Sequence, residues 1–333
     1  MATVDQREAT GAAPARPAPA PAPRRPRRAL AAVALLLVAY GALALANDPG
    51  GYLGTDTGGK VLTLEAMDER GASTDLDVGY WAEARDPDGD LHPYYGTGRI
   101  GDRWIQVTTV PMILAARPLH DVGGYRLSLL LPMAGGVLCA AAARSLARRF
   151  GADEDRARWA FWLVGLAGPV LLYAVDLWEH TLGLAAMAWA VVALADARAG
   201  ERLGRVAVLG GAAGLLWGAG FSMRTESLLY GATMTGAVLL WTVVVDRRLG
   251  RSLVIGAASA AGVAIGVLAN RALEAEVLGG SLRTGRAGGA AGGAGADLGD
   301  RLREGLVTSI GLVSGAGTPE LVIGAVGVAG LAL

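Results

Sequence analysis

Three ionisable residues, Asp176, Glu179 and His180, interrupt the apolar stretch "PVLLYAVDLWEHTLGLAAMAW" (169–189). Such groups are costly in hydrocarbon, so either this stretch is not one membrane segment or the three residues occupy a special position. In a helical turn, positions i, i+3 and i+4 share a face, so the three side chains could point together. They are therefore candidates for a binding or reaction site, and a solvated loop at a helix end is the alternative.

A second group of candidate residues lies near the start of the chain. The segment "GYLGTDTGGK" (51–60) contains Asp56 and Lys60 among glycines. Glycine has no Cβ, so such a segment allows the close approach of backbone or of a ligand. A plain turn explains the segment equally well.

The third group is Arg224 with Glu226, in "GAGFSMRTESLLY" (218–230). A guanidinium group forms bidentate, charge-assisted hydrogen bonds, so an arginine at the level of lipid headgroups is suited to holding a phosphate. The alternative is an Arg–Glu pair whose long side chains reach from an apolar segment to the interface.

Apolar runs of membrane length recur along the whole chain. It has 333 residues, 53% of them hydrophobic, and a mean hydropathy of +0.40. These values and runs predict an all-α polytopic membrane protein with about eight transmembrane helices. The expected spans are 29–46, 124–143, 159–175, 181–197, 206–221, 227–245, 252–270 and 318–333.

The two terminal spans each leave an alternative open. The first, 29–46, could pass for a signal peptide with its cleavage site at Ala44–Ala46, but we interpret it as an uncleaved span because many spans follow. The last stops at Leu333 in mid-run, so either the chain is a fragment or its final helix is unusually short.

The arginines predict the orientation of the spans. Residues 1–28 are rich in Ala, Pro and Arg, and we expect a disordered cytoplasmic tail followed by a transmembrane domain over 29–333. With the tail inside, arginines recur at every cytoplasmic turn, as the positive-inside rule requires. We therefore expect a multi-pass protein of the cell membrane with a cytoplasmic N-terminus. The arginines are Arg24, Arg25, Arg27, Arg28, Arg144, Arg148, Arg149, Arg156, Arg158, Arg198, Arg202, Arg205, Arg247, Arg248 and Arg251.

This orientation places all three groups of candidate residues on the external face. The external segments are a large first loop (47–123), the turns at 176–180 and 222–226, and a glycine-rich loop (271–317). Within the first loop, "WIQVTTVPMILAA" (104–116) is apolar but too short to span, so we expect an interfacial or re-entrant helix there.

Composition argues against several classes of function. The formal net charge is zero, so we expect no nucleic-acid partner. Cys139 is the only cysteine, which excludes a disulfide framework within the chain and a thiolate metal cluster. His92 and His120 are isolated in sequence, so we expect no metal site and no cofactor, although a divalent metal stays possible.

Together these features resemble the GT-C superfamily of integral membrane glycosyltransferases, in the branch of protein O-mannosyltransferases and aminoarabinose lipid A transferases. The resemblance covers roughly residues 29–333. It rests on the acid after the first span ("TDTGGK"), the large first loop with "HPYYGTGRIGDRWIQVTTVPMILAARPLHDVGG", the stretch "PVLLYAVDLWEHTLGLAAMAW" and "GFSMRTESLLY".

The resemblance implies sugar transfer from a polyprenyl-phosphate donor to a lipid, glycan or protein acceptor on the external side of the bilayer. Asp56 matches the family's general base, and attack opposite the leaving group would invert the anomeric centre. Arg224, with Lys60 second, would stabilise the departing phosphate. Asp176, Glu179, His180 and Glu226 would complete the substrate-binding site.

Two other classes of function stay open. One is a non-catalytic membrane scaffold or binding protein with the same fold. The other is a transporter or flippase of lipid-linked intermediates. An ion-coupled transporter needs acidic groups or broken helices near mid-membrane depth, whereas the interiors of the expected spans are almost free of charge.

Overall fold

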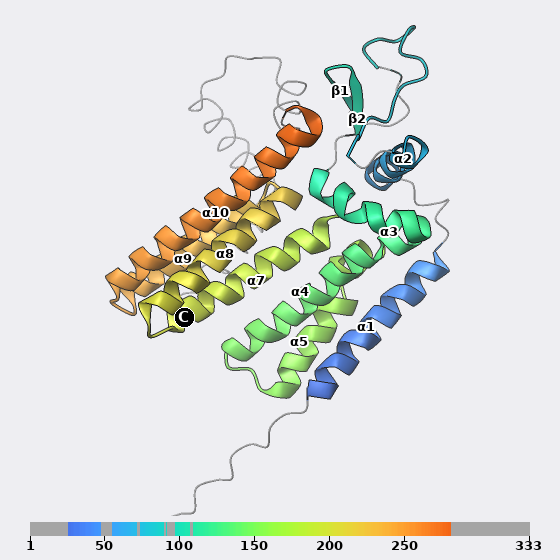
Figure 1. Cartoon of the computed structure of the whole chain (residues 1–333). Helices are drawn as coiled ribbons and strands as arrows, with labels where there is room; N and C mark the ends of the chain where they lie inside the picture. Colours follow the sequence, from blue (N-terminus) through green and yellow to red (C-terminus); the bar gives the residue numbers. More distant parts are fainter. Residues whose placement is uncertain are drawn as a thin grey trace, which may run out of the picture.

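The computed structural model describes residues 26–47, 55–71, 74–89, 91, 97–106 and 109–280, and most of them are helical (Figure 1). Among these described residues, six helices are long and apolar enough to cross a membrane. The chain is therefore a multi-pass membrane protein, as expected. The six are α1 (Pro26–Ala46), α4 (Leu130–Arg149), α7 (His180–Ala199), α8 (Leu203–Met223), α9 (Ser227–Val244) and α10 (Leu249–Leu278).

The span expected at 159–175 is not one helix. It is divided between α5 (Glu154–Leu166) and α6 (Pro169–Ala174). Gly168 lies between them with φ 99°, a conformation that side chains disfavour, and Pro169 lacks the N–H that a continuing helix needs. The apolar run is therefore interrupted between two helices before Asp176. The span expected at 318–333 lies outside the described residues.

Two helix boundaries also differ from the expected ones. The helix in the span expected at 124–143 begins at Leu130, directly after Leu129, whereas Gly123 and Gly124, with φ 61° at Gly124, form a kink inside the preceding helix (Val110–Ser128). Helix α10 continues to Leu278, well beyond the expected end at 270, and ends at Gly279 in the left-handed conformation.

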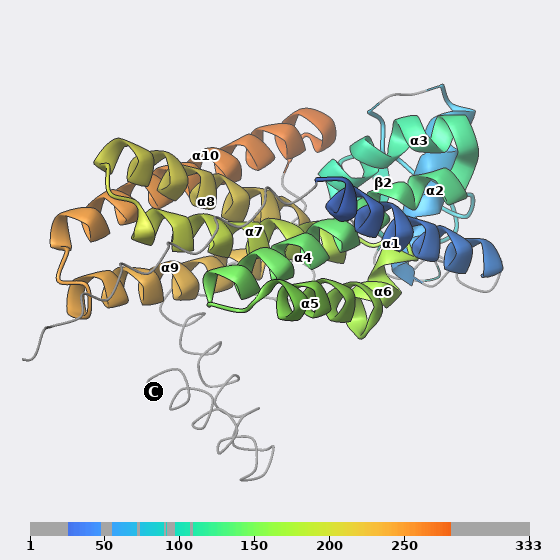
Figure 2. The same cartoon turned by 90° about the horizontal axis from the view of Figure 1, so that it is seen from below.

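The membrane-length helices lie side by side, and the first large loop is folded across one end of them (Figures 1 and 2). This loop contains α2 (Thr55–Glu69), the strands β1 (Thr97–Ile100) and β2 (Arg103–Gln106), and α3 (Val110–Ser128). The strands form an antiparallel hairpin that pairs Thr97 with Gln106. The short apolar helix expected at 104–116 is thus wrong at its start, because β2 includes Trp104 and the helix begins at Val110.

The hairpin is joined to the bundle through Arg103. Its guanidinium donates to the carbonyl oxygens of Val277 and Leu278, at 3.0 and 2.6 Å. These carbonyls belong to the last turn of α10, where the helix itself supplies no donor. Arg103 therefore satisfies the end of α10 and fixes the loop to it.

Two helices of the bundle approach each other through small residues. Glycines of α8 face Ser259, Gly262 and Gly266 of α10; a Cβ added to Gly218 would lie 2.8 Å from the Gly266 Cα. A Cβ on Gly214 would overlap the Ser259 carbonyl group. Small residues allow this close backbone packing, which holds helices together where lipid provides no hydrophobic driving force.

We expect Gly214→Val to lower the stability of the bundle by about 1–3 kcal/mol, because the added side chain must push α8 away from α10. The measurement is unfolding of the purified chain in detergent. Gly236→Val is the matched control, since Gly236 has no neighbour within 4 Å of an added Cβ. Equal stability of the two variants would contradict this packing.

Candidate functional site

The three groups of candidate residues meet at the end of the bundle that carries α2. Lys60 of α2 places its Nζ 2.9 Å from Glu179 Oε2, and Arg224 Nη1 lies 3.7 Å from Glu179 Oε1. Arg224 also forms an ion pair with Glu226. A series of ion pairs thus connects segments that are far apart in the sequence.

Helix ends position these side chains. Glu179 is the residue before α7, Arg224 follows the last residue of α8, and Glu226 precedes α9. The short connections at 176–180 and 224–226 lie at the same end of neighbouring helices, so their charged residues are brought together without entering the bundle. The sequence prediction that these turns share one face is consistent with this arrangement.

Asp56 begins a helix rather than a loop. It lies in the first turn of α2, where a negative charge is favoured by the helix dipole. Its side chain is exposed and lies within electrostatic range of the His180 imidazole. Thr57 and Lys60 point the other way and are buried, at 1% and 2% exposure. One helix therefore presents Asp56 to solvent and Lys60 to the interior.

Asp176 is held by a network that the sequence did not reveal. Its Oδ1 accepts hydrogen bonds from Thr57 Oγ1 at 2.7 Å and from the Tyr125 hydroxyl at 3.4 Å. Trp178 Nε1 donates to Thr57 Oγ1 at 2.8 Å. Burial, reinforced by the Asp176 charge, raises the pKa of Tyr125, so that its hydroxyl stays a donor. Asp176 therefore joins α2, α3 and the turn before α7.

Two aromatic side chains pack beside the charged residues of the site. The Tyr173 ring stacks on His180 at 4.4 Å between centroids, and Trp178 lies 4.6 Å from His180. Lys60 Nζ lies 5.7 Å from the Trp178 ring centre. Stacked aromatic and imidazole rings restrict one another's rotation, so His180 has a fixed orientation.

Glu179 is ionised in spite of its burial. Burial alone would raise the pKa of its carboxyl, but the adjacent Lys60 ammonium outweighs this effect and holds the pKa below its ordinary value. The buried Glu179 carboxylate thus attracts two cations, Lys60 and Arg224. It can fix the position of Arg224 at the entrance of the neighbouring groove.

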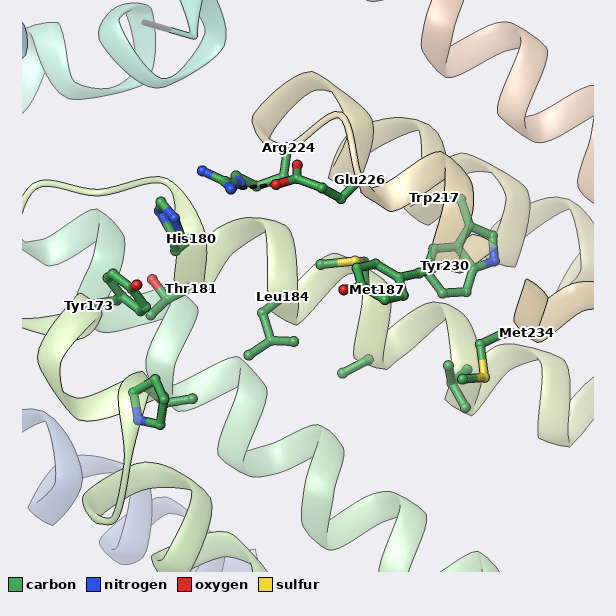
Figure 3. Close-up of a pocket in the computed structure, with 14 residues that line it drawn as sticks. Tyr173, His180, Thr181, Leu184, Met187, Trp217, Arg224, Glu226, Tyr230 and Met234 are labelled. Atoms are coloured by element: carbon green, nitrogen blue, oxygen red, sulfur yellow. Dashed lines mark hydrogen bonds and ion pairs between the residues drawn. The ribbon is translucent and has the colours of Figure 1, made fainter. Parts of the chain in front are cut away.

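That groove has a volume of about 450 Å³ and lies between α6, α7, α8 and α9 (Figure 3). Its polar end contains His180, Arg224 and Glu226, and the remainder is largely apolar. Such a shape matches a molecule with an anionic head and a long hydrocarbon chain. The apolar part includes Leu184, Met187, Ala188, Trp217, Tyr230 and Met234.

The predicted site residues thus come together, with different exposures. Lys60 is buried and paired with Glu179. The site also includes Thr57, Tyr125, Tyr173 and Trp178, which sequence reasoning did not assign. Tyr173 comes just before the acidic turn at 176–180 and Trp178 lies within it, and this proximity was the available signal.

No protein-family model, no curated protein and no solved structure matches this chain. Its function is therefore argued from the geometry of the site.

Proposed function

We propose that this chain is a membrane glycosyltransferase of the GT-C kind, which moves a sugar from a polyprenyl-phosphate donor to an acceptor at the external membrane surface. One observation carries the proposal: a charged cluster containing Arg224 and Glu179 lies at the mouth of an apolar groove between membrane-length helices. A lipid-linked sugar has the same division into a charged, hydrophilic head and a hydrocarbon chain.

In this proposal the prenyl chain lies along the apolar part of the groove and its phosphate lies at Arg224. The Arg224 side chain is 32% exposed, so it is accessible from the mouth. Its contacts with Glu179 and Glu226 hold the guanidinium in place before the donor arrives. A fixed cation stabilises the negative charge that develops on the phosphate as the bond to the sugar breaks.

Asp56 would then act as the general base. An acceptor hydroxyl is a weak nucleophile, and a carboxylate in hydrogen-bond reach can take its proton while the oxygen attacks the anomeric carbon. The sugar leaves the phosphate as the new glycosidic bond forms, so attack from the opposite side inverts the anomeric centre. His180, whose ring stacks on Tyr173, would orient sugar or acceptor hydroxyls.

Lys60 takes a different role from the one its sequence position indicates. Because it is 2% exposed and paired with Glu179, it acts as a positioning residue for Glu179 and, through it, for Arg224.

We expect Ala188→Trp to weaken donor binding roughly 5- to 150-fold, since forcing an indole into an occupied groove costs about 1–3 kcal/mol. The measurement is labelling of the purified chain by a photoreactive polyprenyl phosphate, in competition with the unlabelled lipid. Ala232→Trp is the matched control: Ala232 is exposed on α9 and does not line the groove. Equal labelling of both variants would exclude the groove as the donor site.

A further inference from the structure

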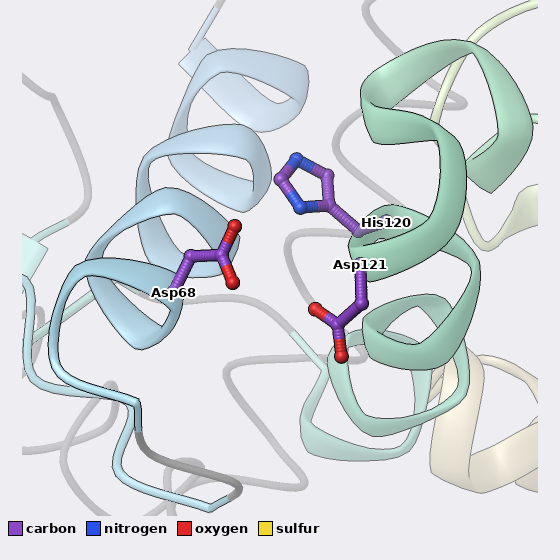
Figure 4. Close-up of side chains that lie close together, drawn as sticks. All are labelled: Asp68, His120 and Asp121. Carbon is purple, nitrogen blue, oxygen red and sulfur yellow. The ribbon is translucent and has the colours of Figure 1, made fainter.

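A second cluster of ionisable side chains lies between α2 and α3, outside the site described above. It contains Asp68 of α2 with His120 and Asp121 of α3, whose ligand atoms all lie within 4.8 Å of one another. Figure 4 shows the imidazole and the two carboxylates facing one another across the gap between the helices. Glu65, one turn before Asp68, places its Oε1 3.4 Å from His120 Nε2.

The buried histidine is the feature that ordinary packing leaves unexplained. His120 is 5% exposed, and within the described residues neither of its ring nitrogens makes a hydrogen bond. Leaving a buried polar group unsatisfied costs about 1–3 kcal/mol. The 3.4 Å contact with Glu65 is an ion pair only when the imidazole is protonated. A ligand that accepts the nitrogen lone pair would remove this cost.

Arg117 organises the two aspartates but does not reach the histidine in any contact the structure gives. It donates to Asp68 Oδ1 at 2.9 Å and lies 3.0 Å from Asp121 Oδ1, and it also donates to the Leu64 carbonyl oxygen. Each carboxylate thus keeps its second oxygen for another partner. Metal-binding carboxylates are commonly oriented in this way by an outer hydrogen bond.

We propose that His120, Asp68 and Asp121 bind one divalent transition-metal ion of the Zn²⁺ class, with Glu65 as a fourth ligand. A set of one imidazole and several carboxylates suits Zn²⁺, whereas Mg²⁺ and Ca²⁺ prefer oxygen ligands alone. Zinc bonds of about 2.1 Å require ligand atoms about 3.4 Å apart. The ligand atoms of Asp68, His120 and Asp121 lie within 4.8 Å of one another, so these three side chains must close by up to about 1.4 Å. Asp68 and Asp121 are 50% and 43% exposed, which leaves them free to turn.

The metal would fasten α2 to α3. Helix α2 carries Asp56, Thr57 and Lys60 in its first half and Glu65 and Asp68 in its second half. A bond between its second half and α3 therefore fixes the helix that supplies these residues to the other site. Binding requires an unprotonated imidazole and ionised carboxylates, and it involves no change of oxidation state.

The test uses the full chain, purified in detergent and freed of metal with a chelator. After Zn²⁺ is added and the excess is removed, we expect elemental analysis to show one zinc per chain and the unfolding temperature to rise. Mg²⁺ should neither stay bound nor raise the unfolding temperature. Asp121→Asn keeps the size of an exposed side chain and should weaken zinc binding at least about tenfold. His120→Ala should remove it. Asp155→Asn is the control, an exposed acid on α5 outside the cluster.

The proposal is overturned if the full chain binds no zinc. It is also overturned if the unaltered chain, Asp121→Asn and Asp155→Asn bind zinc equally. Asp121→Asn decides the matter even if His120→Ala does not fold. Metal content and unfolding temperature are measured without sugar transfer, so this proposal and the proposed function can fail separately.

Discussion

Replacing Asp56 with Asn should abolish sugar transfer. We expect the rate to fall by about 10²- to 10⁴-fold, the contribution of a positioned general base. Asparagine keeps the size of aspartate and its ability to form hydrogen bonds, but it cannot take a proton from the acceptor hydroxyl. Cells that lack this gene should accumulate the lipid-linked sugar donor. Mass spectrometry of their lipid extracts then shows whether a reintroduced chain consumes it.

The structure gives a reason for this sensitivity. Asp56 lies at the start of α2, exposed, and within electrostatic range of His180, which lines the mouth of the groove. A carboxylate at this position can accept a proton from an acceptor hydroxyl. Since the Asp56 side chain makes no contact that supports the bundle in the described residues, its loss should leave the fold intact.

Glu69→Gln is the matched control for Asp56→Asn, because Glu69 is an exposed acid at the other end of the same helix. It should consume the donor as the unaltered chain does. If Asp56→Asn also consumes the donor, the assignment of the base is wrong. If the unaltered chain binds polyprenyl phosphate but never consumes the donor, the chain is a binding protein or a transporter instead.

The helical bundle could largely be predicted from the sequence, because apolar runs of membrane length follow directly from the thickness of the bilayer. The expectation of one continuous helix at 159–175 was wrong for a local reason. Its average hydropathy is that of a membrane helix, but Gly168 and Pro169 within it break the helix. Hydropathy averaged over a window hardly changes with two such residues, although these two residues are enough to interrupt a helix.

The site could be predicted only as a set of residues on one face. The glycines of "TDTGGK" indicated a loop, yet they lie in α2, where Gly59 leaves space for the Gln106 side chain of β2. Which side of α2 faces inward depends on β2 and α3, and no local pattern encodes that packing. The sequence therefore could not predict the burial of Lys60 or the hydrogen bonds of Thr57 and Tyr125 to Asp176.

Removing only the positive partner of the buried ion pair should destabilise the protein strongly. We expect Lys60→Met to lower the free energy of unfolding by about 3–5 kcal/mol, because Glu179 is left as a buried carboxylate without its nearest cation. Arg224, at 3.7 Å, can compensate in part and should keep the loss near the lower end of this range. Chemical unfolding of the purified chain in mixed micelles provides the measurement.

The double variant Lys60→Met with Glu179→Met separates the cost of an isolated charge from the value of the pair. Replacing both partners of a buried ion pair by apolar residues of similar volume is often nearly neutral for stability. We therefore expect the double variant to be more stable than Lys60→Met alone. Arg158→Met, which breaks the exposed pair with Asp155 on α5, is the control and should change stability little.

The same double variant distinguishes positioning from folding. Without Glu179, Arg224 keeps only Glu226 among its ion-pair partners in the described residues, and its guanidinium is no longer held between two carboxylates. We therefore expect the double variant to consume the lipid-linked donor poorly even though its stability is regained. A double variant that is both stable and fully active would show that the buried pair contributes nothing to catalysis, and Arg224 would then have to reach the phosphate without Glu179.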